Sequence, residues 1–372
     1  RLLSARAGTL PSCQGRPPAR WAHAAPPVCQ GVRVRRLLLS TLPALLLVAA
    51  VACGGGDDDP ATDAAAGGEV STTPTTGGGG ATGPSGELDL LSYNVAGLPE
   101  ILSGSEPAEN MPLIGPRLND YDLVLLQETW KTPDPNPLAP LRVYHEELES
   151  RVDFEHGTES AALPLGGDAT RPEAILADGL NVFSRFPLGE VTRERWVGCF
   201  GGADTSQGGA GDCLATKGFL LTTVTLADGV VVDVYDLHAE AGSTDEDQAL
   251  QADDYEQLAA FVVEHSAGRP VLLAGDTNLH TDDPVDPEHP EGEGDLAIWE
   301  SFLDATGLTD VCAALDCDDP GAIDKAAFRS DGGVSLEPLT HDNPTADFTR
   351  DDGEDLSDHP PLAVRFHWSA PG

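Results

Sequence analysis

Basic residues are scarce in this chain of 372 residues, which has 21 lysines and arginines against 62 aspartates and glutamates. The formal net charge of −41 disfavours nucleic acid as a partner, because binding to a nucleic-acid backbone depends on lysine and arginine contacts with phosphate. So acidic a surface is typical of proteins in a salty medium rich in divalent ions, where salt screens surface charges. The composition therefore disfavours a dedicated DNA-cleaving enzyme.

Methionine is also nearly absent, and no apolar run is long. Met111 is the only methionine, and we interpret residues 1–31, rich in Arg, Pro and Ala, as a leader of uncertain origin. The most apolar segment, residues 37–52, contains Pro43 and is short for a membrane span, which needs about 20 residues. Three arginines precede this segment and small residues end it, a pattern typical of a secretory signal.

The residues that end the apolar segment indicate how an exported chain would be held. Ala50-Val51-Ala52-Cys53 resembles a bacterial lipobox, which predicts a lipoprotein-type signal peptide over residues 32–52 and lipidation of Cys53. An ordinary cleaved signal and a weak membrane anchor are the alternatives. Residues 53–86 are mostly Gly, Asp, Ala, Thr and Pro, a composition that favours a flexible tether. We therefore expect a cell-envelope lipoprotein, on the outer face or in the periplasm, or a secreted protein.

Four cysteines follow the tether: Cys199, Cys213, Cys312 and Cys317. Four cysteines in an exported protein predict two disulfides. Pairing of sequence neighbours, Cys199 with Cys213 and Cys312 with Cys317, is the simplest connectivity. Closing a loop of about 15 residues contributes roughly 3 kcal/mol in the chain-entropy view. A zinc site is disfavoured, because no suitably spaced histidines accompany these cysteines.

Residues 87–372 carry the pattern of a folded domain. Short runs rich in Val, Leu and aromatics, bounded by Gly, Asp or Pro, predict strands. They are Leu88–Val95, Leu123–Gln127, Leu180–Ser184, Phe219–Leu226, Val230–Asp236, Val271–Ala274 and Val364–Trp368. Helical spacing of apolar residues predicts helices over Ala249–Glu264 and Leu296–Thr306. The mixture favours an α/β domain with strand-rich layers inside and helices outside.

Polar residues stand at the ends of several predicted strands, where a core strand would not need them. They occur in Ser92-Tyr93-Asn94, Gln127-Glu128, Asp236-Leu237-His238, Gly275-Asp276-Thr277-Asn278 and Ser357-Asp358-His359-Pro360. Each fragment alone is equally compatible with a strand cap, a turn or a core histidine. Cleaving a phosphodiester requires a cation to neutralise charge, a base to activate water and an acid for the leaving group. The five fragments together therefore favour a metal-dependent phosphodiesterase.

Within these five fragments, some residues suit a magnesium ion and others suit a general base. Magnesium prefers a few protein oxygens besides water and substrate phosphate, so Glu128 with a neighbouring asparagine is an adequate ligand set. A histidine beside an aspartate, as in Asp358-His359, is held in a basic and oriented state near neutral pH.

The order of motifs is similar to that of the endonuclease/exonuclease/phosphatase superfamily, from about Leu88 to Trp368. These motifs are SYNV, LLQETW, DGLNVFSRFP, KGF, HAEA, AGDTN, IDKAAF and LSDHPP. The resemblance implies a DNase-like four-layer α/β sandwich, in which two packed, mainly antiparallel sheets are flanked by helices. It also implies a Mg²⁺ cofactor, with Mn²⁺ and Ca²⁺ as alternatives.

The resemblance implies a role for each motif residue. Glu128 would be the principal metal ligand, with Asn94 beside it. Asp276 and Asn278 would orient water and the scissile phosphate, and His238 would contact the phosphate. His359 would be the general base, paired with Asp358, and Asp324 would lie near the site.

Two further motifs resemble the neutral sphingomyelinase branch: Asp178-Gly179, before a strand that ends in SRFP, and Lys217-Gly218-Phe219. Lys217 would bind a phosphate or pair with an acidic neighbour. The chain departs from the family pattern at Asp236, where asparagine is usual, and at Ala239, where leucine is common. Residues 330–356 lack the exposed aromatic pair with which membrane-lytic relatives enter bilayers. Trp196 and Phe200 would provide an interfacial loop instead, or they would be buried in a structural role.

The resulting hypothesis is a sphingomyelinase-like hydrolysis of a phospholipid head-group bond. The alternatives are a secreted nuclease, a phosphatase of soluble phosphoesters, and a catalytically silent binding lipoprotein, which the intact motifs disfavour. We expect the protein to be a monomer that contacts membranes through its lipid anchor.

Overall fold

The computed structural model describes residues 83–98, 105–131, 143–162, 171–204, 206, 208–281 and 292–372. The predicted leader, signal peptide, Cys53 and most of the predicted tether lie outside these residues. Ser85 and Gly86, which the sequence analysis assigned to the tether, belong to the first strand. Within the described ranges, no helix combines the length and the hydrophobicity that a membrane span requires.

The described residues form two six-stranded sheets. The first sheet has the order β11 (Ser335–Asp342), β12 (Leu362–Ser369), β1 (Ser85–Asn94), β2 (Leu123–Gln127), β4 (Asn181–Ser184) and β3 (His156–Gly157). The second has the order β5 (Thr192–Arg195), β6 (Gly218–Ala227), β7 (Val230–His238), β8 (Val271–Asp276), β10 (Asp324–Arg329) and β9 (Thr309–Asp310). Neighbouring strands are antiparallel except in the pairs β1–β2 and β7–β8.

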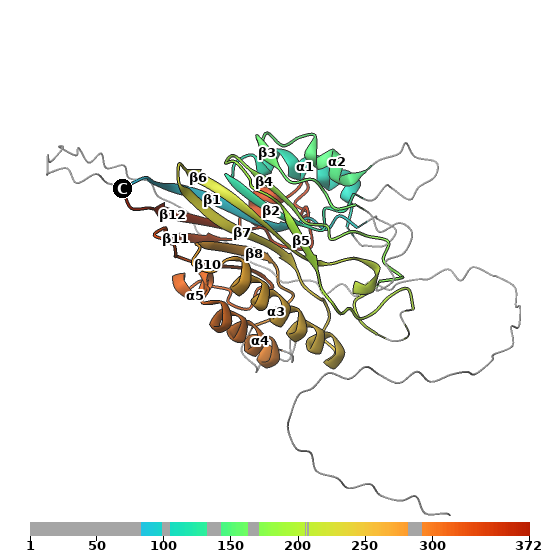
Figure 1. The fold of residues 1–372 in the computed structure, drawn as a ribbon. Coiled ribbons are helices and arrows are strands. Elements are labelled where there is room, and N and C mark those ends of the chain that lie inside the picture. The colour runs from blue at the N-terminus through green and yellow to red at the C-terminus, as the bar shows by residue number, and fades with distance from the viewer. Residues whose placement is uncertain are drawn as a thin grey trace, which may run out of the picture. The chain divides into compact units, whose positions relative to one another are not determined.

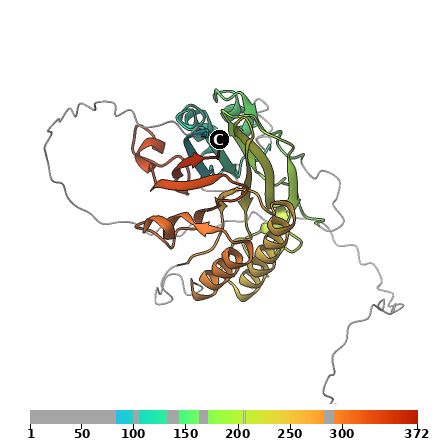
Figure 2. The ribbon, with the colours of Figure 1, turned by 60° about the vertical axis from the view of Figure 1, so that its left-hand side comes forward.

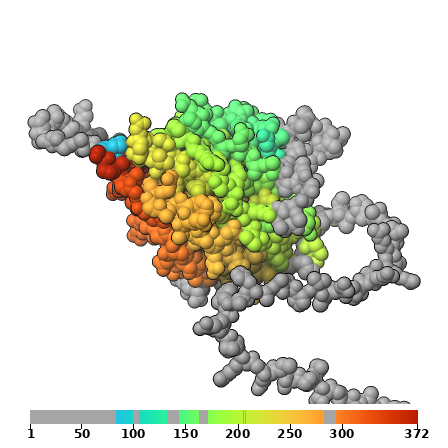
Figure 3. Space-filling model, in the orientation of Figure 1, coloured from blue at the N-terminus to red at the C-terminus, as the bar shows by residue number. Residues whose placement is uncertain are grey.

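Helices cover the outer face of each sheet (Figures 1 and 2). The α-helices of the described part are α1 (Pro107–Leu118), α2 (Tyr144–Glu149), α3 (Asp245–His265), α4 (Gly292–Thr306) and α5 (Val311–Leu315), and two 3-10 turns are η2 (Asp212–Leu214) and η3 (Thr345–Phe348). In the space-filling view, the gold and orange atoms of α3 and α4 cover the lower part of the face shown (Figure 3).

The side chains of β2 show why four layers form. Leu123 and Leu125 point into the core between the sheets, whereas Val124 and Leu126 pack with Met111 and its neighbours under α1 and α2. Successive strand residues point to opposite faces, so a strand that is apolar on both faces needs a cover on each side. On the second sheet, the face away from β2 packs against α3 and α4. The predicted four-layer sandwich is therefore confirmed.

Each sheet contains one parallel pair joined by a helix, β1–α1–β2 in the first and β7–α3–β8 in the second. The carboxyl ends of parallel strands lie at the same edge of a sheet, which is where open α/β sheets bind ligands. β1 and β2 contact β7 and β8 across the sandwich. This arrangement brings four strand ends, and the polar residues that follow them, to one place.

Two disulfides join Cys199 to Cys213 and Cys312 to Cys317, which is the predicted pairing of cysteines that are neighbours in the sequence. The first closes a loop within the connection between β5 and β6, and the second joins α5 to the residues that follow it.

Candidate active site

A single amide group joins the carboxylates of the two sheets. The Nδ2 atom of Asn94, at the end of β1, donates to Asp276 Oδ2 at the end of β8 (2.9 Å) and to Glu128 Oε1 just after β2 (3.2 Å). The same nitrogen lies 3.4 Å from Nε2 of His359. Residues from three distant parts of the sequence therefore meet around Asn94, as the motif order predicts.

The orientation of the Asn94 amide is fixed by its other atom, since Oδ1 accepts a hydrogen bond from the backbone N–H of Ala96 (3.0 Å). An amide nitrogen cannot replace that oxygen as an acceptor. As placed, Asn94 presents donors to the carboxylates, and it would have to rotate before its oxygen could bind a cation. The role of Asn94 as a metal ligand stays a prediction.

Left-handed backbone conformations occur at three residues of this site. Ala96, Glu128 and Asn278 have φ angles of 48°, 59° and 48°. This conformation costs roughly 1–2 kcal/mol for a residue with a side chain. Gly97 lies so close to Glu128 that an added Cβ would collide with the Glu128 carbonyl oxygen. The local backbone is therefore held in a strained form, which is typical of functional sites.

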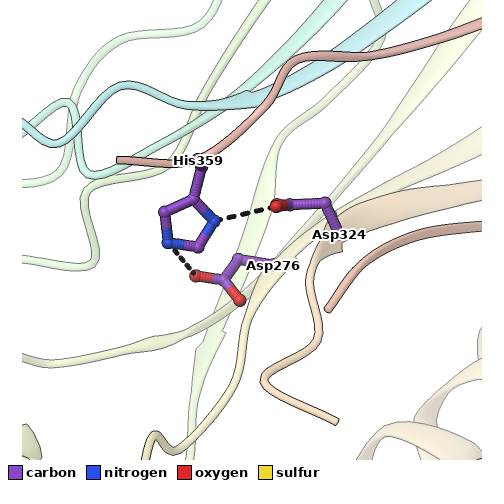
Figure 4. A group of neighbouring side chains, drawn as sticks. All are labelled: Asp276, Asp324 and His359. Carbon is purple, nitrogen blue, oxygen red and sulfur yellow. Dashed lines mark hydrogen bonds and ion pairs between the residues drawn. The ribbon is translucent and has the colours of Figure 1, made fainter. Parts of the chain in front are cut away.

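His359 is held between two carboxylates (Figure 4). Its Nδ1 lies 2.8 Å from Asp324 Oδ2, and its Nε2 lies 3.7 Å from Asp276 Oδ2. Its backbone N–H donates to Ser357 Oγ (3.2 Å), and that hydroxyl in turn donates to the Asn94 carbonyl (2.7 Å). The ring is thus fixed from both sides.

Asp358, predicted as the partner of His359, does not occupy that position. Asp358 is exposed, and its carboxylate accepts a hydrogen bond from Ser357 at 3.4 Å. Asp324, which the sequence placed only near the site, is buried and bonds the ring directly. The orienting carboxylate comes from β10 of the second sheet, 35 positions away from the histidine.

The charges around His359 decide its protonation. Burial lowers the pKa of His359, but the hydrogen bond to Asp324 and the charges of Asp276, Asp324 and Asp358 outweigh burial and raise the pKa to about 10. Burial disfavours the charged form of Asp276, yet His238 and His359 outweigh it and lower the pKa of that carboxyl. Without a bound cation, the histidine is therefore protonated and Asp276 is ionised at neutral pH.

His238 approaches Asp276 from β7, with its Nε2 3.2 Å from Asp276 Oδ2. The His238 carbonyl accepts from Trp196 Nε1 (2.7 Å), and Trp196 is buried. Of the two alternatives for Trp196, the structure shows the buried one, while Phe200 is half-buried. Asn278 donates its backbone N–H to Asp276 Oδ1 and its side-chain amide to the Ala239 carbonyl, both at 3.1 Å.

Lys217 pairs with an acidic residue that the sequence analysis missed. Its Nζ lies 2.5 Å from Asp212 Oδ1, and both side chains are buried. Burial lowers the pKa of Lys217, but the charges of Asp212, Asp276 and Glu128 outweigh it and raise the pKa. The signal available was the position of Asp212, which directly precedes Cys213 and stands five positions before Lys217 in the sequence.

The donor set fits a divalent cation. Ligand atoms of Asp276, Asp324 and His359 lie within 4.8 Å of one another, and Asp324 Oδ1 is buried without a hydrogen-bond partner. Glu128 joins this group through Asn94. Clustered carboxylate oxygens suit hard cations such as Mg²⁺, Mn²⁺ or Ca²⁺.

Comparison with known proteins gives matches both in sequence and in fold. The sequence model of the Endonuclease/Exonuclease/phosphatase family matches residues 91–359. Proteins named sphingomyelinase from Mycobacterium bovis and Mycobacterium tuberculosis are 30% identical over 306 residues, covering 77% of this chain and 54% of theirs. The chain therefore spans about half the length of the curated relatives it matches.

Solved structures show the same fold. A beta toxin from Staphylococcus aureus has a TM-score of 0.51 at 17% identity, covering 74% of this chain and 99% of the toxin. An endonuclease/exonuclease/phosphatase from Beutenbergia cavernae has a TM-score of 0.50 at 19% identity, covering 77% of this chain and 72% of its own.

Proposed function

Because the chain belongs to the endonuclease/exonuclease/phosphatase family, we propose that it is a divalent-metal-dependent phosphodiesterase that hydrolyses the head-group bond of a phospholipid. The observation that carries this proposal is the position of His359, oriented by Asp324 and facing Asp276 beside Glu128. The relatives named sphingomyelinase favour sphingomyelin or a related lipid as the substrate. The formal charge of −41 disfavours DNA.

His359 acts as the general base in this proposal. Asp324 accepts the Nδ1 proton and so leaves Nε2 as the position that exchanges a proton with water. A base needs an unprotonated Nε2, whereas the surrounding carboxylates raise the His359 pKa to about 10. Partial neutralisation of those carboxylates would therefore favour the basic form of His359 at neutral pH.

We place the cation on Glu128 and Asp276, because His359 and Asp324 act together as the base. Such an ion would supply that neutralisation and would also stabilise the negative charge on the phosphate oxygens. Mg²⁺ is the ion that we expect, with Mn²⁺ and Ca²⁺ as alternatives. Asn94 positions the two carboxylates through its amide nitrogen.

The remaining side chains bind the substrate phosphate and the charge that develops on it. His238 projects from β7 beside Asp276, and Asn278 follows β8 with its backbone bonded to the same carboxylate. Lys217 contributes positive charge from behind the Ala239 carbonyl, to which its Nζ donates (3.3 Å). We therefore assign direct substrate binding to His238 and Asn278. Lys217, which is buried and paired with Asp212, would assist substrate binding through its positive charge alone.

Export is part of the same proposal. Two disulfides in the described part of the chain favour an oxidising compartment, which agrees with the predicted signal segment. Lipidation of Cys53 would place the enzyme on a membrane surface.

The test is a substrate panel. The purified full chain is assayed with Mg²⁺ and with a chelator against sphingomyelin, phosphatidylcholine, duplex DNA, bis(p-nitrophenyl) phosphate and the monoester p-nitrophenyl phosphate. We expect Mg²⁺-dependent release of phosphocholine and little DNA cleavage. Preferred cleavage of DNA would identify a nuclease, preferred release of inorganic phosphate from monoesters would identify a phosphatase, and binding without turnover would identify a silent lipoprotein. Each of these outcomes would overturn the proposal.

A further inference from the structure

A second side-chain pair crosses between the sheets next to the site. Gln127, the last residue of β2, donates its Nε2 proton to Asp236 Oδ1 on β7 at 2.7 Å. Both side chains are fully buried. The pair parallels the Asn94–Asp276 bond, because in each case an amide of the first sheet donates to a carboxyl group of the second.

The two remaining polar atoms of this pair lack hydrogen-bond partners, which indicates that the Asp236 carboxyl group carries a proton. Gln127 Oε1 and Asp236 Oδ2 are both buried and have no hydrogen-bond partner within the described residues. Gln127 Nε2 also lies 3.3 Å from Ser92 Oγ, which leaves its oxygen unused. Two acceptors that lack a donor cost free energy in the interior, whereas one proton on Asp236 Oδ2 would satisfy both atoms.

Among the described residues, no cation forms a hydrogen bond or ion pair with Asp236. Its neighbours in the sheet are Leu220 on β6 and Ala274 on β8. Two charged groups act on it, Arg193, which lowers its pKa, and Asp178, which raises it, and these bond each other at 2.7 Å. Burial raises the pKa of Asp236 well above its usual range, and the hydrogen bond from Gln127 offsets this only in part. Asp276 differs, because two histidines face it.

We propose that Asp236 is a neutral carboxylic acid that donates its Oδ2 proton to Gln127 Oε1, and that this acid–amide pair fixes the end of β2 against the end of β7. Gln127 immediately precedes Glu128, and Asp236 stands two residues before His238 on the same face of β7. The pair therefore sets the separation between the groups that the two sheets contribute. Asp236 is a positioning residue and does not touch the substrate.

Neutrality is part of this positioning role. An ionised Asp236 would add a buried negative charge behind a site that already gathers Glu128, Asp276 and Asp324, and like charges in an interior repel strongly. A neutral acid holds Gln127 with two bonds and adds no charge. Asparagine offers the same donor and acceptor in the same shape, which provides a matched variant.

The first test concerns protonation and needs no enzymatic activity. In infrared spectra at pH 7, the wild-type chain should show a protonated carboxyl C=O band that is lost in Asp236→Asn. The native state holds one proton more than the unfolded state above the unfolded aspartate pKa of about 3.9. The folded-to-unfolded ratio of the wild type should therefore fall relative to Asp236→Asn, by up to about tenfold per pH unit, until the native carboxyl ionises. Absence of the band together with a pH-independent ratio would overturn the proposal, as would failure of Asp236→Asn to fold.

The second test exchanges the partners. Gln127→Glu places two acids together and should destabilise the chain above pH 5, whereas the double variant Gln127→Glu/Asp236→Asn restores an acid–amide pair and should recover the folded fraction. No recovery would contradict the pairing.

The third test rests on the proposed function. Asp236→Ala should lower kcat on the phosphodiester substrate by roughly 10- to 100-fold with little change in KM, and Asp236→Asn should restore kcat. If the wild type has no turnover, the proposed function fails while the infrared and stability tests still decide the protonation. Equal kcat in Asp236→Ala and the wild type would remove the positioning role.

Discussion

His359 Nδ1 lies 2.8 Å from Asp324 Oδ2, although a different aspartate, Asp358, precedes the histidine directly in sequence. The bond joins the loop before β12 of the first sheet to the start of β10 in the second. The orientation of the proposed base therefore depends on how the two sheets pack.

The first prediction separates the two aspartates. Asp324→Asn should lower kcat by at least about 10²-fold, because a neutral amide no longer stabilises the protonated His359 ring by charge and can also present a donor, which favours the wrong tautomer. Asp358→Asn, which changes an exposed carboxylate, is the matched control and should stay within about threefold of the wild type. Steady-state kinetics of both variants decide the point. A larger loss in Asp358→Asn would restore the partner expected from the sequence.

The second prediction concerns the titration of His359 in chelator-treated protein. NMR of the imidazole should show a pKa near 10, and added Mg²⁺ should lower it because the cation offsets the carboxylate charges. A pKa raised in the folded state contributes stability that is complete below about pH 6.5 and is lost as pH rises through the folded value. The stability advantage of the wild type over His359→Gln should therefore shrink between pH 7 and 10, as denaturant titrations would measure. A constant difference across that range would contradict the assignment.

The third prediction separates catalysis from folding at Glu128. Glu128→Gln should reduce Mg²⁺-dependent turnover by at least about 10²-fold, the scale of a lost electrostatic contact with the reacting group. Burial raises the pKa of Glu128, so its charge is unfavourable to the fold, and the variant should be as stable as the wild type or more stable. Glu337→Gln, on the exposed face of β11, is the control. Retained turnover in Glu128→Gln would remove Glu128 from the metal site.

The fourth prediction tests the close approach of Gly97 to the Glu128 backbone. Gly97→Ala places a Cβ against the Glu128 carbonyl, which must shift, at a cost of about 1–3 kcal/mol in stability and at least about tenfold in kcat. Gly189→Ala also crowds a neighbour, the Thr223 side chain, but that contact lies away from the site. The control should lose stability with little loss of kcat. Equal kcat values in the two variants would show that Gly97 has no special role.

The strands that hold the site could be predicted because both of their faces are apolar and polar residues follow them. Leu123–Gln127 was predicted with the bounds that the structure has. The strand predicted over Val271–Ala274 extends to Asp276. The helix predicted from Ala249 begins at Asp245, because Thr244 and Asp247 form a capping box that precedes the apolar spacing.

Two elements, α1 and β11, were not predicted from the sequence because they contain proline. Pro112 and Pro116 lie inside α1, although proline usually ends a helix, and the buried face that includes Ile114 compensates for the lost hydrogen bonds. Pro338 lies in β11 at a shift of register, and β11 is the edge strand of its sheet. An edge strand tolerates proline because one side needs no ladder hydrogen bond.

Two partnerships of the site depended on contacts that no local pattern records. Asp324 meets His359 through sheet packing, and Asp212 meets Lys217 through the disulfide-closed loop. The motifs predicted side chains that the structure brings together, but the choice among several acidic neighbours required the three-dimensional arrangement.

The pairing of the first strand with the last fixes the direction in which the site faces. Ser85 at the start of β1 lies opposite Ser369 at the end of β12, whereas Asn94 is at the far end of β1. Ten strand residues span about 30 Å. If the segment before Ser85 attaches the protein to a bilayer, the candidate active site lies at the opposite end of β1 from the attachment point. The predicted flexible tether would then have to let the domain turn before its site met the supporting leaflet, whereas a facing membrane would meet the site directly.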